Sequence, residues 1–388
     1  MSSEYFYIVN DRTPTGTHTL PDPQNPFDNP SEFHSYQCDY GAIVPEIRTE
    51  GFRLPHLPGK SERSRIRRYY NIVGGFLAGH FVIANVAAVV LMLGIEALIT
   101  VVDRAAVGDL PYNYDTLLAD YVEQGSTIMT ALSALVYGLC NLLVAILGCS
   151  ATRIPLPNLF RTKDLTPMRM FGYICVALLL QSATGLAATW LTDLFESAGI
   201  TLYEADLPST TTARGTVLML VYSVIVAPIT EELLMRGFVL KNLSRSNQHF
   251  GIIMTAFIFG IWHENVAQFL LAFVAGCLFG YMAVKHDSLV PCIICHMVVN
   301  LFAELFGIFE DYGLEIGTKI SEFVYFGMVI FGIVWLIRLL LTERFPRATV
   351  AQQERGIRIS LSSPVLLLML VCHIGAAVLF ILQASSII

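Results

Sequence analysis

Nine apolar stretches, most of them long enough to cross a lipid bilayer, constrain the fold of this chain more than any other feature. A membrane-spanning helix needs about 20 consecutive apolar residues, because each residue rises by only ~1.5 Å. The fifth stretch is short, so we expect it to cross only part of the bilayer before the chain turns at His263-Glu264-Asn265. The sequence therefore predicts an all-α, polytopic transmembrane bundle of about eight to nine spans. The stretches lie at residues 70–102, 126–149, 168–195, 214–240, 250–263, 266–285, 289–309, 318–341 and 361–385.

The overall composition excludes a soluble globular protein. Of the 388 residues, 54% are hydrophobic and only 14% are charged, whereas soluble domains carry about 25% charged residues. The net charge is -7 and the basic residues do not gather on one soluble face, so we expect no nucleic-acid partner. All the cysteines except Cys38 lie in or beside apolar stretches, which indicates small buried hydrophobic residues rather than a disulfide framework.

The first 68 residues differ from the rest of the chain. They are polar and rich in proline, aspartate and asparagine, so we expect residues 1–68 to be a tail with little regular structure and residues 69–388 to form the membrane domain. Two alternatives remain for the tail: its aromatic side chains pack on the membrane domain, or the tail is mobile. No apolar core follows a basic start near the N-terminus, so we expect no cleavable signal peptide.

The lysines and arginines are distributed unevenly between the two sets of loops. Most of the 24 basic residues fall just before the first span or in the loops that would share its side, whereas the opposite side contains only Arg104, Arg214 and Lys319. Because basic loops stay in the cytoplasm, we expect a cytoplasmic N-terminus and, with nine spans, an outside C-terminus. We expect a multi-pass protein of the bacterial cell membrane.

Three of the apolar stretches contain polar residues at similar depths. The helical rise places these polar groups roughly 10–20 Å from the predicted cytoplasmic ends. A charged side chain at the centre of a span costs roughly 2.5–3.5 kcal/mol on insertion scales. We therefore expect one hydrated cavity, shared by the three spans and open toward the cytoplasmic half. The residues are Glu231, Glu232 and Arg236 in the fourth stretch, Phe259 and His263 in the fifth, and His296 and Asn300 in the seventh.

The spacing of these residues indicates how they divide their tasks. Glu232 and Arg236 are four residues apart and can pair along one helix face. Glu231 points about 100° away from that face and lacks a partner within its own helix. His296 and Asn300 are also four residues apart, so both face the same direction.

These residue types together are sufficient for peptide hydrolysis without a covalent intermediate. A carboxylate in a low-dielectric cavity is tuned toward general-base work. A histidine beside it can share the proton and hold a water molecule. A second histidine and an asparagine amide can donate hydrogen bonds to a developing oxyanion.

Three motifs resemble the signature motifs of the CPBP family, which contains CAAX proteases and bacteriocin-processing enzymes. The resemblance covers about residues 165–310, which we expect to be the catalytic core. It implies that Glu232 and Arg236 support the site or bind substrate, with Phe259 beside them. The motifs are Glu231-Glu232-xxx-Arg236, Phe259-xxx-His263 and His296-xxx-Asn300.

The resemblance also implies an activity, which is intramembrane endopeptidase cleavage. By this resemblance, Glu231 and His263 activate the water, and His296 and Asn300 form the oxyanion site. The implied partners are membrane lipid and a peptide or protein substrate at the membrane.

A catalytic metal is the main alternative for the chemistry. Glu231, His263 and His296 would form the two-histidine, one-glutamate ligand set that zinc hydrolases use. The glutamate-centred mechanism of the family favours no metal. We therefore expect no cofactor, with one zinc ion on these three residues as the alternative.

Two other function classes use the same residues. A proton- or ion-coupled transporter would use the carboxylates as a relay, but paired halves with interrupted helices are not visible in the sequence. An inactive immunity or scaffold protein on the same fold would not need the complete motif set. A Cys295 nucleophile is disfavoured by its apolar surroundings, and Cys292-xx-Cys295-His296 is not a haem-attachment site because it lies within a predicted span.

Other residues in the spans receive structural interpretations. Glu304 extends the face of His296 and Asn300. Of two roles, lining the cavity mouth or lying at a solvated outer edge, we expect the second. His80, Glu96 and His373 are isolated in their spans, so we expect helix-contact or interface roles there. Pro291 opens the seventh stretch, where we expect irregular backbone near the cavity.

Overall fold

The computed structural model describes residues 58–106, 114–202, 213–245, 247–343, 358–360 and 362–384. These residues contain eight helices that are long and apolar enough to cross a membrane. No residue in the described ranges belongs to a strand. The predicted polytopic helical bundle is therefore confirmed. Its elements are α4 (Pro58–Ala106), α5 (Tyr114–Ala151), η2 (Leu156–Phe160), α6 (Pro167–Ser197), α7 (Ala213–Val221), η3 (Tyr222–Val226), α8 (Ala227–Glu232), η4 (Leu233–Leu240), α9 (Lys241–Leu243), α10 (Gln248–Ile261), α11 (Val266–His286), α12 (Val290–Asp311), α13 (Glu315–Thr342) and α15 (Pro364–Ala384).

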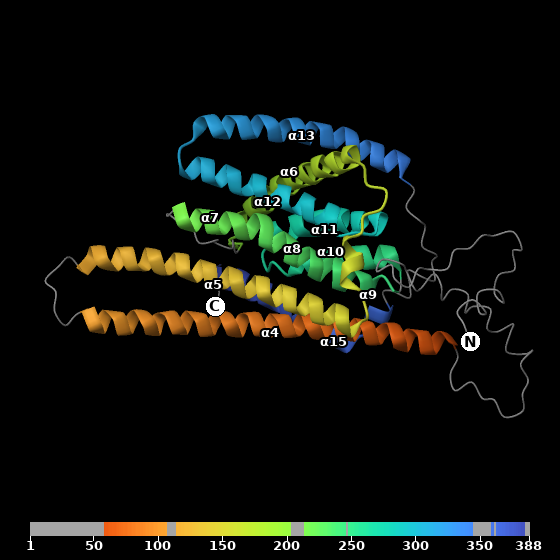
Figure 1. Ribbon diagram of the computed structural model, residues 1–388, viewed down its shortest axis with the longest axis horizontal. Coiled ribbons are helices and arrows are strands. Elements are labelled where there is room, and N and C mark those ends of the chain that lie inside the picture. Colours follow the sequence, from red (N-terminus) through yellow and green to blue (C-terminus); the bar gives the residue numbers. More distant parts are fainter. Residues whose placement is uncertain are drawn as a thin grey trace, which may run out of the picture.

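The helices run roughly along the long axis of the molecule (Figure 1). The α4–α5 hairpin forms one edge, with α15 packed on α4, and the α6–α13 pair forms the opposite edge. The segment from α7 to α9 and helices α10, α11 and α12 lie between these edges. The central position of this middle group explains why every residue of η4 is buried.

Short polar signals in the sequence set the helix boundaries. Thr166 caps α6 by accepting a hydrogen bond from the backbone of Arg169, and Asn265 caps α11 in the same way. Asp287 ends α11 in the left-handed conformation with φ 53°. Pro291 lies in the first turn of α12, where proline is tolerated. The irregular backbone expected at Pro291 is therefore absent from that position.

The short fifth stretch behaves as the sequence predicts. Helix α10 has 14 residues and is therefore about 21 Å long, which is less than the ~30 Å of a hydrocarbon core. The chain then turns through Glu264, which has a φ of 56°, and returns along α11. This hairpin brings the turn at 262–265 into the interior of the bundle, beside α4 and α15.

The predicted polar tail lies mostly outside the described residues. Helix α4 begins at Pro58, so the last part of the stretch predicted as tail, residues 58–68, is helical. The basic residues in that part do not prevent helix formation, because Arg and Lys are good helix formers.

The loops predicted to share one side of the membrane do lie at one end of the bundle. The backbone N–H of Lys163, between α5 and α6, donates to the carbonyl of His286 at the end of α11, with a distance of 2.9 Å. The hydroxyl of Tyr70, near the start of α4, donates to the carbonyl of Leu243 at the end of α9, at 2.8 Å. This arrangement is the one that an alternating topology requires.

The contact between α6 and α13 leads to a first prediction. A Cβ atom at Gly332 would clash with the backbone carbonyl oxygen of Cys175, and neither backbone can yield without moving a whole helix. We expect Gly332→Ala to lower the free energy of unfolding by about 1–3 kcal/mol, measured as a lower thermal midpoint of the purified protein in detergent. The matched control is Gly327→Ala on the same helix, where nothing lies within 4 Å of the added Cβ. Equal midpoints for the two variants would contradict the close approach.

Candidate active site

A fully buried ion pair forms the base of the site. Nη1 of Arg236 donates to Oε1 of Glu232 at 2.9 Å, and neither side chain has exposed surface. Nη2 of the same guanidinium donates to the carbonyl of Gly276 on α11 at 3.4 Å. The guanidinium carbon also lies 4.6 Å from the ring centre of Phe259 and 5.4 Å from that of Phe279. The pair expected from the sequence spacing is present, and two aromatic faces help to compensate the buried cation.

His296 lies between the two adjacent carboxylates. Its Nδ1 is 3.0 Å from Oε1 of Glu232, and its Nε2 is 3.8 Å from Oε2 of Glu231. Because a carboxylate oxygen accepts hydrogen bonds, Nδ1 of His296 carries a proton in its contact with Glu232. The imidazole ring is thereby fixed in orientation, with Nε2 directed toward Glu231.

His263 is oriented by the helix that precedes it. Its Nδ1 is 2.8 Å from the backbone carbonyl of Phe259. A carbonyl can only accept, so Nδ1 carries the proton and Nε2 remains free as an acceptor in the neutral ring. The Phe259 ring packs edge-on against both imidazoles, at 5.0 Å from His263 and 5.9 Å from His296. Phe259 therefore contacts both histidines of the site.

Asn300 binds a backbone carbonyl in the π-helical segment η3, which faces α12. Its Nδ2 donates to the backbone carbonyl of Ser223 at 2.7 Å. That carbonyl is available because the N–H of Ala227 donates to Tyr222 in the wider π-helical pattern of η3, and because Pro228 has no N–H. One amide hydrogen of Asn300 is thereby used, and the second remains for another acceptor.

The four residues proposed as catalytic line a single cavity of about 350 Å³. Phe259 contributes to its wall, whereas Glu232 and Arg236 lie behind the wall. The side chain of Glu231 is 21% exposed and faces this space rather than the buried pair. The remaining lining residues are Ser223, Gln268, Leu271, Ala272, Ala275, Phe279, Val299, Ala303 and Glu304.

The cavity extends in a different direction from the one expected. Along α12 its lining runs from His296 to Glu304, away from the helix end predicted to be cytoplasmic. The opposite direction is filled by Arg236, Phe279 and other buried side chains. With the predicted orientation, the expectation of a cavity open toward the cytoplasmic half is therefore wrong. Glu304 lines the cavity instead of standing apart at a solvated edge.

Two polar lining residues were not among the sequence candidates. Ser223 precedes Glu231 by two helical turns, and Gln268 lies in the first turn of α11. Each is a single polar residue near the end of an apolar stretch, which is a weak signal on its own. Their place in the site depends on the π-helical segment and on the α10–α11 hairpin, and neither feature has a clear sequence signature.

A second buried cluster supports the turn that carries His263. The indole of Trp262 lies between the imidazoles of His80 on α4 and His373 on α15, with ring centres 4.6 and 4.8 Å away. Nδ1 of His373 is 3.3 Å from Oε1 of Glu264, and Nε2 of His80 is 2.8 Å from Oδ1 of Asn141. The helix contacts expected for His80 and His373 are therefore present, and they lie directly beside the candidate site. The side chain of Glu96 lies outside the described part of the chain.

The alternative reaction groups receive little structural support. Cys295 is fully buried in the core and does not line the cavity, so it is not placed to act as a nucleophile. Among the described residues, no group of three His, Cys, Asp or Glu side chains has the geometry to hold a metal ion. The zinc alternative on Glu231, His263 and His296 and the expectation of no cofactor both remain predictions.

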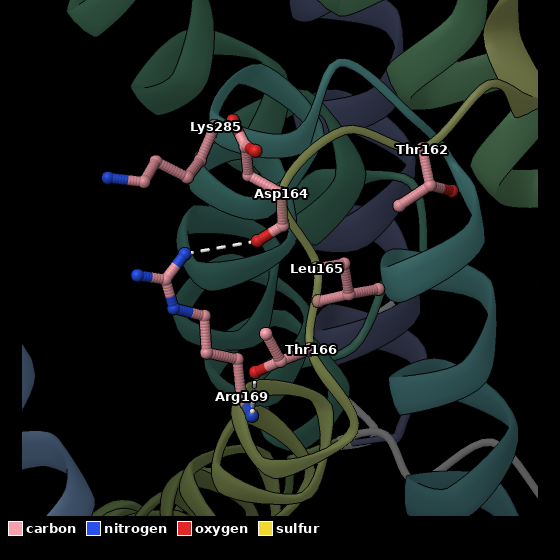
Figure 2. A pocket seen from close by; sticks show the side chains of 6 residues that line it. All are labelled: Thr162, Asp164, Leu165, Thr166, Arg169 and Lys285. Carbon is pink, nitrogen blue, oxygen red and sulfur yellow. Dashed lines mark hydrogen bonds between the residues drawn. The ribbon is translucent and has the colours of Figure 1, made fainter.

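A larger hollow of about 830 Å³ at the predicted cytoplasmic end is not part of this site (Figure 2). Arg169 donates there from Nη1 to the carbonyl of Asp164 and from its backbone to Thr166. Lys285 donates to Glu343 at 2.5 Å, and this hydrogen bond lowers the pKa of Glu343. Both cationic side chains at this hollow are thus already hydrogen-bonded within the protein. None of its lining residues belongs to the three motifs.

Comparison with known proteins identifies the same segment. Residues 213–302 match the family model described as type II CAAX prenyl endopeptidase Rce1-like, and this segment contains all three motifs. No curated protein and no solved structure matches the chain. The resemblance to the CPBP family is thereby confirmed, while α4, α5, α6, α13 and α15 lie outside the matched segment.

Proposed function

We propose that this multi-pass membrane protein is a glutamate-dependent intramembrane endopeptidase. Its substrate is a peptide or protein held at the membrane. The proposal starts from the match of residues 213–302 to the Rce1-like family model of CAAX endopeptidases. The observation that carries the proposal is the meeting of Glu231, His263, His296 and Asn300 on one cavity. These residues come from three separate helical segments, and each polar side chain is expensive at its depth unless it has a task.

Water activation would fall to Glu231 and His263. Both side chains reach the cavity, and the free Nε2 of His263 can orient a water molecule toward the Glu231 carboxylate. Glu231 accepts a proton from this water as its oxygen attacks the carbonyl carbon of the scissile peptide bond. The same proton then passes to the leaving nitrogen as the bond to carbon breaks.

Stabilisation of the oxyanion would fall to His296 and Asn300. The second amide hydrogen of Asn300 is available for an oxyanion, because the first is held by Ser223. His296 donates Nδ1–H to Glu232, so its participation requires a proton on Nε2 as well. Donors fixed in this way before the reaction need little rearrangement in the transition state.

The test compares the peptides released from membranes that contain the wild-type protein with those from membranes that contain Glu231→Gln. We expect a set of cleavage products that is present with wild type and absent with the variant. The matched control is Glu310→Gln, which changes an exposed carboxylate on the same α12 helix that carries His296. Identical product sets for wild type and Glu231→Gln would overturn the proposal.

The cluster around Trp262 leads to a further prediction. Loss of the His373 ring removes both its ring contact with Trp262 and its contact with Glu264, so the neighbouring His263 loses its support. We expect His373→Ala to reduce kcat by about 10- to 100-fold, because a misplacement of about 1 Å has effects of this size. His373→Phe keeps an aromatic ring against Trp262 and should retain more activity.

The control for this prediction is Cys372→Ala, which changes the exposed neighbour of His373. Steady-state kinetics should show a lower kcat for His373→Ala with a smaller change in KM. Wild-type kcat in His373→Ala would show that the cluster does not position His263.

A further inference from the structure

Glu304 is an intramembrane carboxylate for which the described part of the chain supplies no cation. It lies on α12 one turn beyond Asn300, it is half-buried, and it lines the active-site cavity. No described side chain pairs with it, in contrast to Glu232, which is held by Arg236. An ionisable group within a span is expensive and therefore indicates a functional partner. We propose that Glu304 selects substrates with a positively charged group, a lysine or arginine side chain, near the cleaved bond.

The position of Glu304 sets the distance of that group from the cleaved bond. Glu304 follows His296 by eight residues on one helix, which corresponds to about 12 Å. An extended peptide advances by about 3.3 Å per residue. The cationic residue therefore lies about three to four residues from the scissile bond.

The wall between the two ends of the cavity suits an extended backbone. Ala272, Ala275 and Ala303 leave room along it, and small side chains give little contact by which bulky groups could be recognised. The hydroxyl of Ser223 is buried and makes no hydrogen bond with described residues, so a peptide N–H or carbonyl would satisfy it. Side-chain selection is thus concentrated at the charged end.

This inference rests on the proposed function and narrows its substrate class. A peptide ending in C-a-a-X carries a free carboxylate three residues beyond its cysteine. Such a carboxylate would lie against Glu304 if the peptide ran along α12 from His296 toward Glu304. Like charges in contact are strongly unfavourable. For a peptide in that direction, Glu304 would favour a substrate with an internal basic residue over one whose carboxyl terminus enters the cavity.

The experiment uses the purified full-length protein in phosphatidylcholine vesicles and membrane-anchored synthetic peptides. The peptide sequence is taken from a wild-type cleavage product, and three versions carry lysine, alanine or glutamate at the third and fourth residues from the cut. We expect wild-type kcat/KM to be at least about tenfold higher for the lysine than for the glutamate peptide. Glu304→Gln should bring this ratio close to one, and Glu304→Lys should invert it. Glu310→Gln, an exposed change six residues further along α12, should keep the wild-type ratio.

Each possible result either supports or overturns the role of Glu304 in substrate selection. A gain in cleavage of the glutamate peptide by Glu304→Lys shows that the variant is folded and that charge is read at this position. An unchanged ratio in Glu304→Gln, or inactivity of both variants on all peptides, overturns the inference. Cleavage that depends on Glu231 but ignores peptide charge overturns only the role of Glu304, whereas wild-type products that persist in Glu231→Gln overturn the proposed function as well.

Discussion

Cleavage by Glu231→Gln is expected to be slower than wild type by about 10²- to 10⁴-fold, the range for removal of a general base. The amide keeps the size of the side chain but cannot accept the proton of the attacking water. His263→Ala should have an effect of similar size, because both residues act on the same water molecule. Initial rates of peptide cleavage in vesicles measure both effects.

The double variant provides a sharper test of this pairing. Residues that act as one unit are not additive, so Glu231→Gln/His263→Ala should be about as slow as the slower single variant. Multiplication of the two single effects would show that the residues work in separate steps. All three variants should elute from gel filtration in detergent as wild type does, because both side chains face the cavity rather than the core.

Arg236→Met is expected to produce the largest loss of stability, about 3–5 kcal/mol. The substitution leaves the carboxylate of Glu232 buried without its cation, and Oε2 of this carboxylate already has no hydrogen-bond partner among the described residues. A lower thermal midpoint and a lower yield of folded protein in detergent would measure the effect.

Removal of both charges separates stability from activity. In Glu232→Leu/Arg236→Met the uncompensated charge is gone, so the double variant should recover much of the stability lost by Arg236→Met. It should remain impaired in cleavage, because His296 loses the carboxylate that orients its ring. A double variant as unstable as Arg236→Met would show that the pair is needed for packing rather than for charge balance.

The sequence predicts the bundle well because hydrophobicity over 20 residues is a local property. All eight long spans and the partial depth of α10 were visible from apolar windows alone. The three motifs also lie together as predicted, since helices of similar direction bring residues of equal depth into one layer. The ion pair of Glu232 with Arg236 is predicted from their spacing of four residues within one helix, and it is present.

Features that depend on tertiary contacts were less predictable. The direction of the cavity depends on which half of the layer is filled by Arg236 and Phe279, and such packing has no pattern in the sequence. The carbonyl of Ser223 becomes available to Asn300 only through the π-helical turn before Pro228. The ring cluster of His80, Trp262 and His373 joins residues that are far apart in the sequence, so each histidine is isolated in its own span when the sequence alone is considered.

The buried guanidinium of Arg236, which lies over the rings of Phe259 and Phe279, closes one end of the active-site cavity. The binding site of an ion transporter must be accessible from each side of the membrane in turn. A cavity that is closed at one end does not allow this unless the buried side chains at that end rearrange. Peptide and both cleavage fragments are therefore expected to enter and leave near the exposed Ala303, at the other end of the cavity. Fragments that linger there obstruct the next peptide, so accumulating product is expected to act as a competitive inhibitor.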